Sequence, residues 1–285
     1  MQINSAKIHV PQELGLLPQN LVQRLQVLPL DKIRRFQTNL DMLATAQSKF
    51  SENPLLTSRS NPEYWRVFAP VLERGRMLDG DRSLFPFADI FGCMMENMGA
   101  KSVLEIGCGT GRILPAIEGR GFRYTGTDMV PEVIEKARQL HPGAEFRAAN
   151  VLNFPKMGPF GAAIATDVLL YLSPKEQVLA LDTLFSLLRP GSPVLIRWAY
   201  NKSPIFDLKE YTIRGQQIFG WAHHVNERYL SGLLETCGFK VFGQIKRLPI
   251  ALGKGKTMDF LIAYAFRNLW HFDNWTMVDL FSGTR

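Results

Sequence analysis

The chain has 285 residues, which is enough for one α/β domain with an addition or for two small domains. Its 46% hydrophobic and 21% charged residues are ordinary for a globular protein, and no apolar run approaches the ~20 residues that span a membrane. The net charge of +7 is mild and leans to residues 201–285, which hold 11 basic and 7 acidic side chains. Because no continuous basic run occurs, a solvated basic surface is favoured over a nucleic-acid-binding face.

The cysteines and the N-terminal pattern indicate the cellular compartment of the protein. Cys93, Cys108 and Cys237 lie far apart and form no Cys-x-x-Cys pair, which disfavours a disulfide framework or a zinc site. The N-terminus lacks the basic-then-apolar pattern of a secretory signal. We therefore expect a cytoplasmic protein without a metal centre, and the sequence leaves its oligomeric state open.

Residues 1–98 show helical periodicity without strand–helix alternation. Apolar residues recur at helical spacing in four stretches, with Pro-containing breakers between them, at 21–28, 33–43, 64–72 and 86–98. This pattern predicts an N-terminal helical cap or lid rather than a second catalytic domain.

Strand–helix alternation begins at residue 99 and defines the second unit, 99–285. The expected strands are 102–106, 122–127, 145–149, 161–165 and 193–198, with helices at 111–118, 133–140 and 175–188. Such alternation predicts a parallel sheet with helices on both faces.

The alternation stops at about 200–224, where aromatic residues stand among charges, and we expect a substrate-cap insertion there. A helix at 227–237 follows. Two strands, 239–246 and 258–266, are then predicted to form an antiparallel hairpin around the Gly253-Lys254-Gly255 turn. The aromatic tail, 268–285, is expected to pack on the fold.

A glycine turn follows the first predicted strand, with Gly107, Gly109 and Gly111 at every second position. The inside of such a turn carries no side chain, so a ligand can approach the backbone beside the free N–H groups of the next helix. A nicotinamide or flavin fingerprint needs its third glycine one residue later, where Arg112 stands. Glu105 would repel a pyrophosphate and attract an ammonium group, which favours a cofactor with a cationic amino-acid end.

Polar residues also end the next two predicted strands. Asp128 follows Gly107 at the spacing of ribose-binding carboxylates, and the amide of Asn150 can meet an adenine edge. Because ligands of open α/β sheets bind at the carboxyl ends of the strands, these residues predict a nucleoside site.

The chain resembles class I S-adenosylmethionine-dependent methyltransferases over about residues 100–266. The segments that carry the resemblance are Glu105–Gly111, Thr127–Met129, Leu187–Gly191 and Cys237–Phe239. The resemblance implies S-adenosyl-L-methionine as cofactor and a Rossmann-like sheet of seven strands. The implied strand order is 3-2-1-4-5-7-6, with the last strand antiparallel.

By the same resemblance, Glu105 orients the methionine part of the cofactor, Asp128 holds the ribose and Met129 packs on the adenine. Asparagine at position 150, where the family usually has aspartate, keeps an acceptor but loses the charge. The full expected set is Glu105, Gly107, Gly109, Gly111, Asp128, Met129, Asn150, Val151 and Thr166.

The methyl acceptor is less defined by the sequence. The fourth strand lacks the Asp/Asn-Pro-Pro-Tyr/Phe signature of amide and adenine methylation, and no Pro-Cys motif or acidic metal cluster stands out. We therefore predict methyl transfer to an O or N atom of a small molecule, as in secondary-metabolite biosynthesis. Two alternatives stay open, namely transfer to a macromolecule (RNA, peptide or carrier-bound chain) and a non-catalytic, cofactor-binding partner subunit.

Candidates for the acceptor side lie outside the nucleoside motifs. His223 and His224 close the insertion and are the candidate general bases, although a purely structural histidine is the simpler interpretation of each. Four further residues are predicted to contact the substrate, Tyr64 and Trp65 from the N-terminal segment and Asp167 and Tyr171 after the fourth strand.

Overall fold

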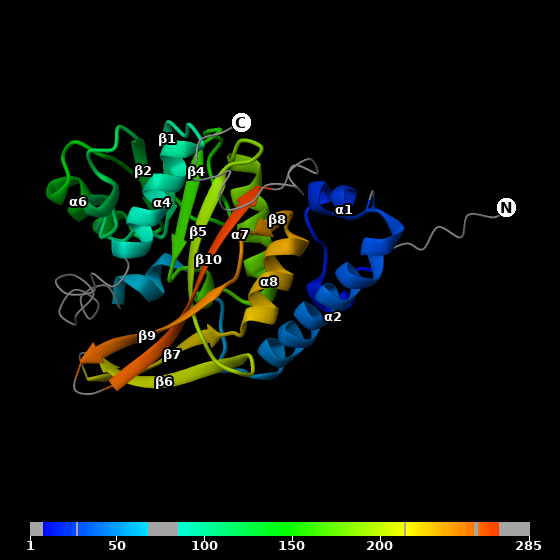
Figure 1. The fold of residues 1–285 in the computed structure, drawn as a ribbon. Coiled ribbons are helices and arrows are strands. Elements are labelled where there is room, and N and C mark those ends of the chain that lie inside the picture. The colour runs from blue at the N-terminus through cyan, green and yellow to red at the C-terminus, as the bar shows by residue number, and fades with distance from the viewer. Residues whose placement is uncertain (1–7, 27, 68–84, 214, 254–255, 268–285) are drawn as a thin grey trace.

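The computed structural model describes residues 8–26, 28–67, 85–213, 215–253 and 256–267, and at its centre is one mostly parallel sheet (Figure 1). The predicted aromatic tail, 268–285, and residues 68–72 of a predicted helix lie outside the described residues. The strands of this sheet are β1 (Ser102–Ile106), β2 (Arg123–Asp128), β3 (Glu145–Ala148), β4 (Ala162–Thr166), β5 (Pro193–Ala199), β8 (Phe239–Val241), β9 (Lys246–Gly253) and β10 (Lys256–Arg267).

The order across the sheet is β3-β2-β1-β4-β5-β10-β8, and β9 also pairs with β10. Strands β1 to β5 run parallel, whereas β10 is antiparallel to β5, β8 and β9. Since β8 and β10 are the sixth and seventh strands of the predicted order, that order and the antiparallel last strand are confirmed.

The predicted hairpin at 239–246 and 258–266 was wrong in detail. The hairpin pairs β9 with β10, whereas the separate strand β8 pairs with Ala265–Arg267 at the other end of β10. Gly243, with a φ of 63°, lies in the bend between β8 and β9 and ends the first of these strands. Because β10 has 12 residues, its edge is long enough for two short partners.

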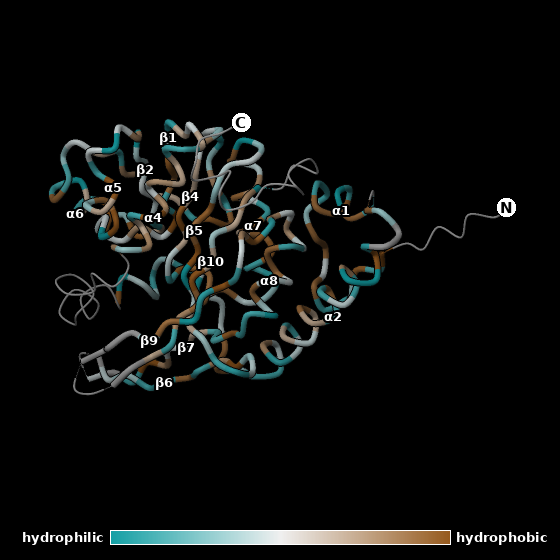
Figure 2. Tube along the Cα trace, viewed as in Figure 1, coloured by the Kyte–Doolittle hydropathy of each residue, from teal (hydrophilic) through white to brown (hydrophobic). Residues whose placement is uncertain are grey.

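Two layers of helices cover the sheet. On one face lie α4 (Phe85–Asn97), α5 (Leu114–Ile117) and α6 (Pro131–Leu140); on the other lie α7 (Pro174–Leu187) and α8 (Glu227–Thr236) (Figure 1). Successive residues of a strand point to opposite faces, so Val103 packs with the first layer and Leu104 with the second. Figure 2 shows the resulting concentration of hydrophobic residues along the central strands.

The N-terminal helices form an outer layer. The single-turn η1 (Gln12–Leu14), α1 (Gln19–Gln26) and α2 (Leu30–Glu52) pack against α7 and α8, away from the first helix layer (Figure 1). Arg24 donates to Asp182 of α7 at 2.6 Å, and Asn39 donates to Glu235 of α8 at 3.1 Å. The division into a cap of residues 1–98 and a core of 99–285 stays a prediction.

The predicted insertion folds into a separate two-stranded hairpin, β6 (Ile205–Ile213) and β7 (Gln216–His224). The indole of Trp221 on β7 is 2% exposed, and its ring centroid lies 5.2 Å from Phe50 of α2 and 5.7 Å from Phe206 of β6. This aromatic cluster attaches the hairpin to the end of α2. None of the helices in the described part of the chain combines the length and apolar character that a membrane span requires.

Candidate active site

The glycine turn, residues 107–111, begins where β1 ends and forms one wall of a pocket. Gly109 has a φ of 55°, and a Cβ added there would meet nothing within 4 Å, so the turn is open on this side. A Cβ added to Gly111 would instead meet His141 at 2.9 Å and Phe146 at 3.0 Å. Gly109 therefore leaves room for a ligand, whereas Gly111 is needed for packing behind the turn.

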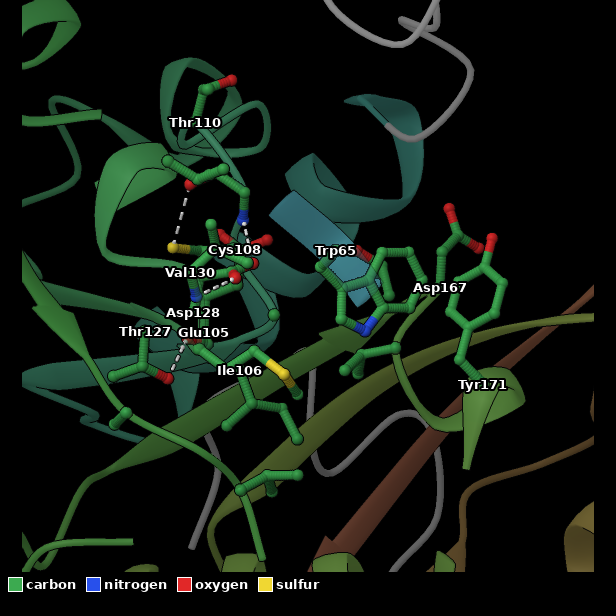
Figure 3. Close-up of a pocket in the computed structure, with 18 of the residues that line it drawn as sticks. Trp65, Glu105, Ile106, Cys108, Thr110, Thr127, Asp128, Val130, Asp167 and Tyr171 are labelled. Atoms are coloured by element: carbon green, nitrogen blue, oxygen red, sulfur yellow. Dashed lines mark hydrogen bonds between the residues drawn. The ribbon is translucent and has the colours of Figure 1, made fainter. Parts of the chain in front are cut away.

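The pocket lies at the carboxyl ends of β1, β2 and β4, as expected for an open α/β sheet (Figure 3). The structure brings together most of the predicted cofactor residues in its lining: Glu105, Gly107, Gly109, Asp128, Met129, Val151 and Thr166. Three of the four predicted substrate contacts line it as well: Trp65, Asp167 and Tyr171.

Of the residues predicted to contact the cofactor or the substrate, three do not line this pocket: Gly111, Asn150 and Tyr64. The Asn150 amide donates to the Ser60 carbonyl at 2.9 Å, and its oxygen accepts from the Leu152 N–H at 3.0 Å. Asn150 therefore joins the end of β3 to the N-terminal segment.

Asp128 joins the end of β2 to the glycine turn. Its carboxylate accepts hydrogen bonds from the N–H groups of Gly109 at 3.1 Å and Val130 at 3.0 Å. Burial raises the pKa of Asp128, while these backbone hydrogen bonds lower it. The N-cap of α6 is Val130, so Asp128 is not a plain helix cap. Its carboxylate is fixed by the backbone at the edge of the pocket.

Glu105 lies at the end of β1 and is 2% exposed. The Tyr124 hydroxyl donates to its carboxylate at 2.5 Å. Burial raises the pKa of Glu105 to about 7, while the Tyr124 hydrogen bond and the charge of Arg112 lower it. A cation bound in the pocket would stabilise the charged carboxylate, which suits the ammonium group of an amino acid.

Asp167 follows β4 and has a φ of 58°, an uncommon backbone conformation for a residue other than glycine. Two guanidinium groups hold its carboxylate: the Arg197 Nε lies 2.9 Å and 3.0 Å from its oxygens, and the Arg112 Nη2 lies 3.4 Å away. Arg197, which is 2% exposed on β5, was not among the site residues predicted from the sequence. A single arginine within the apolar run of the predicted strand was the available signal.

Residues 57–67, here called the strap, cross the strand ends and form the opposite wall. The Trp221 indole of β7 donates to the Thr57 carbonyl at 2.9 Å, and Ser60 donates to Glu176 of α7 at 3.1 Å. At the other end, Arg66 pairs with Glu132 of α6 at 3.0 Å. The strap is therefore attached to elements on both sides of the pocket.

Trp65 brings the strap into the pocket. Its indole N–H donates to the Arg59 carbonyl at 2.8 Å, and its ring centroid lies 4.8 Å from that of Tyr171. Figure 3 shows Trp65, Asp167 and Tyr171 on one side of the pocket, opposite Asp128 and the turn. Arg59 also lines the pocket but was not predicted from the sequence, because it stands within a segment interpreted only as a breaker.

The two candidate general bases lie elsewhere. The ring of His223 is buried between Gln177, 3.1 Å from its Nδ1, and Phe206, stacked at 4.3 Å, and burial lowers its pKa to about 3. His224 Nε2 lies 3.6 Å from Asp207. Neither histidine lines the pocket, so a catalytic role for either stays a prediction that the geometry does not support.

Comparison with solved structures finds proteins of the same fold. A methyltransferase from Methanosarcina mazei is 22% identical, with a TM-score of 0.52, over 59% of this chain and 92% of its own. A Burkholderia thailandensis 1,6-didemethyltoxoflavin-N1-methyltransferase is 21% identical, with a TM-score of 0.54, over 73% and 91%. One from Clostridium acetobutylicum is 10% identical, with a TM-score of 0.53, over 71% and 98%. Among curated protein sequences, none matches this chain.

The sheet order and the pocket at the strand ends define a Rossmann-like fold of the class I methyltransferase type. Residues 103–191 match a family described as a methyltransferase domain. Residues 103–191 are therefore a methyltransferase domain of the type that uses S-adenosylmethionine as methyl donor, which makes the protein an enzyme. The residues present fit this cofactor, because the turn is open at Gly109 and the carboxylates of Glu105 and Asp128 both line the pocket beside it.

Proposed function

We propose that this enzyme methylates an O or N atom of a small molecule that binds between the glycine turn and the strap. The observation that carries this proposal is the continuity of the pocket from Gly109 to Trp65 and Tyr171 beneath an attached strap. A covered pocket with aromatic walls suits a compact acceptor better than a long chain. The strap and the β6–β7 hairpin together would then form the acceptor cap.

The turn side would hold the cofactor. The carboxylate of Glu105 attracts the ammonium group, the backbone at Gly107 and Gly109 lies along the methionine part, and Asp128 accepts from the ribose hydroxyls. Met129 and Val151 pack on the adenine, with Thr166 near the sulfur. Bound there, S-adenosylmethionine supplies a methyl group on a positively charged sulfur.

The strap side would orient the acceptor. Trp65 and Tyr171 pack on its faces, and the fixed carboxylate of Asp167 accepts a hydrogen bond from its N–H or O–H group. Orientation of the acceptor towards the methyl group accounts for much of the rate of such displacements. The Burkholderia enzyme of similar fold, which binds 1,6-didemethyltoxoflavin together with S-adenosylhomocysteine, is compatible with this arrangement.

The test follows a labelled methyl group from S-adenosylmethionine into a cell extract separated into metabolites, RNA and protein. We expect label in the metabolite fraction with the wild-type enzyme and none with a variant that does not bind the cofactor. Label that enters only RNA or protein would overturn the proposed acceptor class while leaving the methyltransferase activity intact.

A further inference from the structure

One cation in the pocket has no counterion among the residues that the structure describes. The Arg59 side chain is 4% exposed and lines the pocket, yet its Nε has no hydrogen-bond partner and no carboxylate pairs with it among the described residues. The other cation of the lining, Arg112, lies 3.4 Å from the carboxylate of Asp167. Arg59 is therefore the lining cation whose charge the described residues leave uncompensated.

Neutral groups surround the Arg59 guanidinium. Its Nη2 donates to the Phe219 carbonyl at 2.5 Å, and its central carbon lies 3.6 Å from the centroid of the Tyr64 ring. Burial lowers the pKa of Arg59, although Tyr64 and Tyr211 raise it. A buried charge without a counterion destabilises a fold, so a bound anion would recover a large part of that cost.

We propose that Arg59 binds a carboxylate of the methyl acceptor, and that the acceptor is a small aromatic acid. This inference rests on the proposed function. A guanidinium group presents a planar set of N–H donors that matches the two oxygens of a carboxylate. The rings of Trp65 and Tyr171, 4.8 Å apart and both in the lining, supply flat surfaces for an aromatic ring beside that anion.

The position of Arg59 separates this anion from the cofactor's own carboxylate. Arg59 belongs to the strap and is hydrogen-bonded to β7, whereas the amino-acid end of the cofactor is expected at the glycine turn. Arg112, which directly follows Gly111, is the cation next to that turn. The carboxylate of the acceptor therefore anchors it on the strap side, while an O or N atom elsewhere on the ring receives the methyl group.

The test measures dissociation constants of matched acids and amides by calorimetry on the full chain saturated with S-adenosylhomocysteine. The probe pairs are salicylate and salicylamide, anthranilate and anthranilamide, and picolinate and picolinamide. For at least one pair we expect the wild type to bind the acid about tenfold more tightly than the amide. Arg59→Met should remove that preference and change the S-adenosylhomocysteine dissociation constant by less than about twofold.

Arg147→Met is the matched control, because Arg147 is exposed on β3 and lies outside the pocket lining; it should keep the acid preference. Arg59→Gln, which retains a donor for the Phe219 carbonyl, replaces Arg59→Met if the latter fails to fold.

Equal binding of acids and amides by the wild type, or an acid preference that persists in the Arg59 variants, would overturn the inference. So would a tenfold weaker binding of S-adenosylhomocysteine by these variants, because Arg59 would then serve the cofactor. Failure of the wild type to bind S-adenosylhomocysteine would instead refute the cofactor site itself.

Discussion

The two walls of the pocket are built in different ways. The turn wall consists of backbone and side chains from the ends of β1 and β2 and the turns that follow them, residues 105–110 and 127–130. The strap wall consists of rings and a guanidinium group held by contacts between residues far apart in the sequence, such as Thr57 and Trp221. Binding of a cofactor that many enzymes share depends on the local backbone geometry of the fold. The shape of an acceptor site depends instead on side chains, which can be exchanged without changing the sheet.

The largest expected effect separates Trp65, which belongs to the strap, from Trp221, which binds the strap from β7. Trp221→Ala should lower the free energy of unfolding by about 3–5 kcal/mol, because it empties a buried aromatic cluster. Trp65→Ala should lower it less, since Trp65 is only half-buried, but it should raise the KM for the acceptor. Denaturant unfolding and steady-state kinetics measure the two effects. Equal losses of stability would show that Trp65 is a core residue rather than part of the acceptor site.

The second prediction concerns the proton on Glu105 in the turn wall. Between pH 4.5 and about 7 the folded protein holds a proton on Glu105 that the unfolded chain has released. The free energy of unfolding therefore falls as the pH rises through this range, by about 3 kcal/mol in total. Glu105→Gln should remove this part of the pH dependence. The measurement is the difference in the free energy of unfolding between the wild type and the variant at each pH.

The titration of Glu105 also tests its proposed contact with the cofactor. Binding of S-adenosylhomocysteine should strengthen as the pH rises through about 7, because the charged carboxylate of Glu105 attracts the ammonium group. Glu105→Gln should bind more weakly and without this dependence. A variant with the wild-type pH profile would contradict the proposed role of Glu105.

The third prediction concerns Asp128. Asp128→Ala should weaken S-adenosylhomocysteine binding by about tenfold to a hundredfold, because it removes a carboxylate acceptor and leaves the Gly109 N–H without a partner. Calorimetric titration measures the change. Glu135→Ala, which removes an exposed acid from α6, is the control and should bind as the wild type does. Unchanged binding of S-adenosylhomocysteine by Asp128→Ala would contradict the proposed contact between Asp128 and the ribose.

The last prediction distinguishes the glycines of the turn. Gly111→Ala should destabilise the fold by about 2–3 kcal/mol, because its Cβ would clash with His141 and Phe146. Gly109→Ala should cost only the backbone strain of about 1 kcal/mol but should weaken cofactor binding. Gly119→Ala is the control for strain alone, since Gly119 has a φ of 81°, open space around it and no place in the pocket lining. Cofactor binding that survives Gly109→Ala would argue against close approach of a ligand.

The turn wall could be predicted because its information is local. The glycines, Glu105 and Asp128 stand at fixed distances along one β-α-β unit, and parallel strands necessarily bring their carboxyl ends together. The strand order came from the family resemblance, and the structure confirmed it. The roles of individual cofactor residues stay predictions that the geometry accommodates.

The strap wall could not be predicted, because its residues carry no periodic signal. Arg59 stands in a stretch that reads only as a breaker, and Arg197 stands in an apolar strand where no partner is visible in the sequence. The histidines stood out as residue types, yet the fold places His223 in a closed network with Gln177 and Phe206. Chemical type alone did not indicate that both histidines of β7 would lie outside the pocket lining.

The sequence by itself determined the layered α/β class, the turn and the type of cofactor, because hydrophobic periodicity and glycine spacing act over a few residues. Only the tertiary structure decided which side chains complete the pocket. Contacts such as Asn150 to Ser60, Arg197 to Asp167 and Trp221 to Thr57 join segments that lie 30 or more positions apart. Their partners are selected by packing of the whole chain, and only this packing shows that Arg59 has no counterion among the described residues.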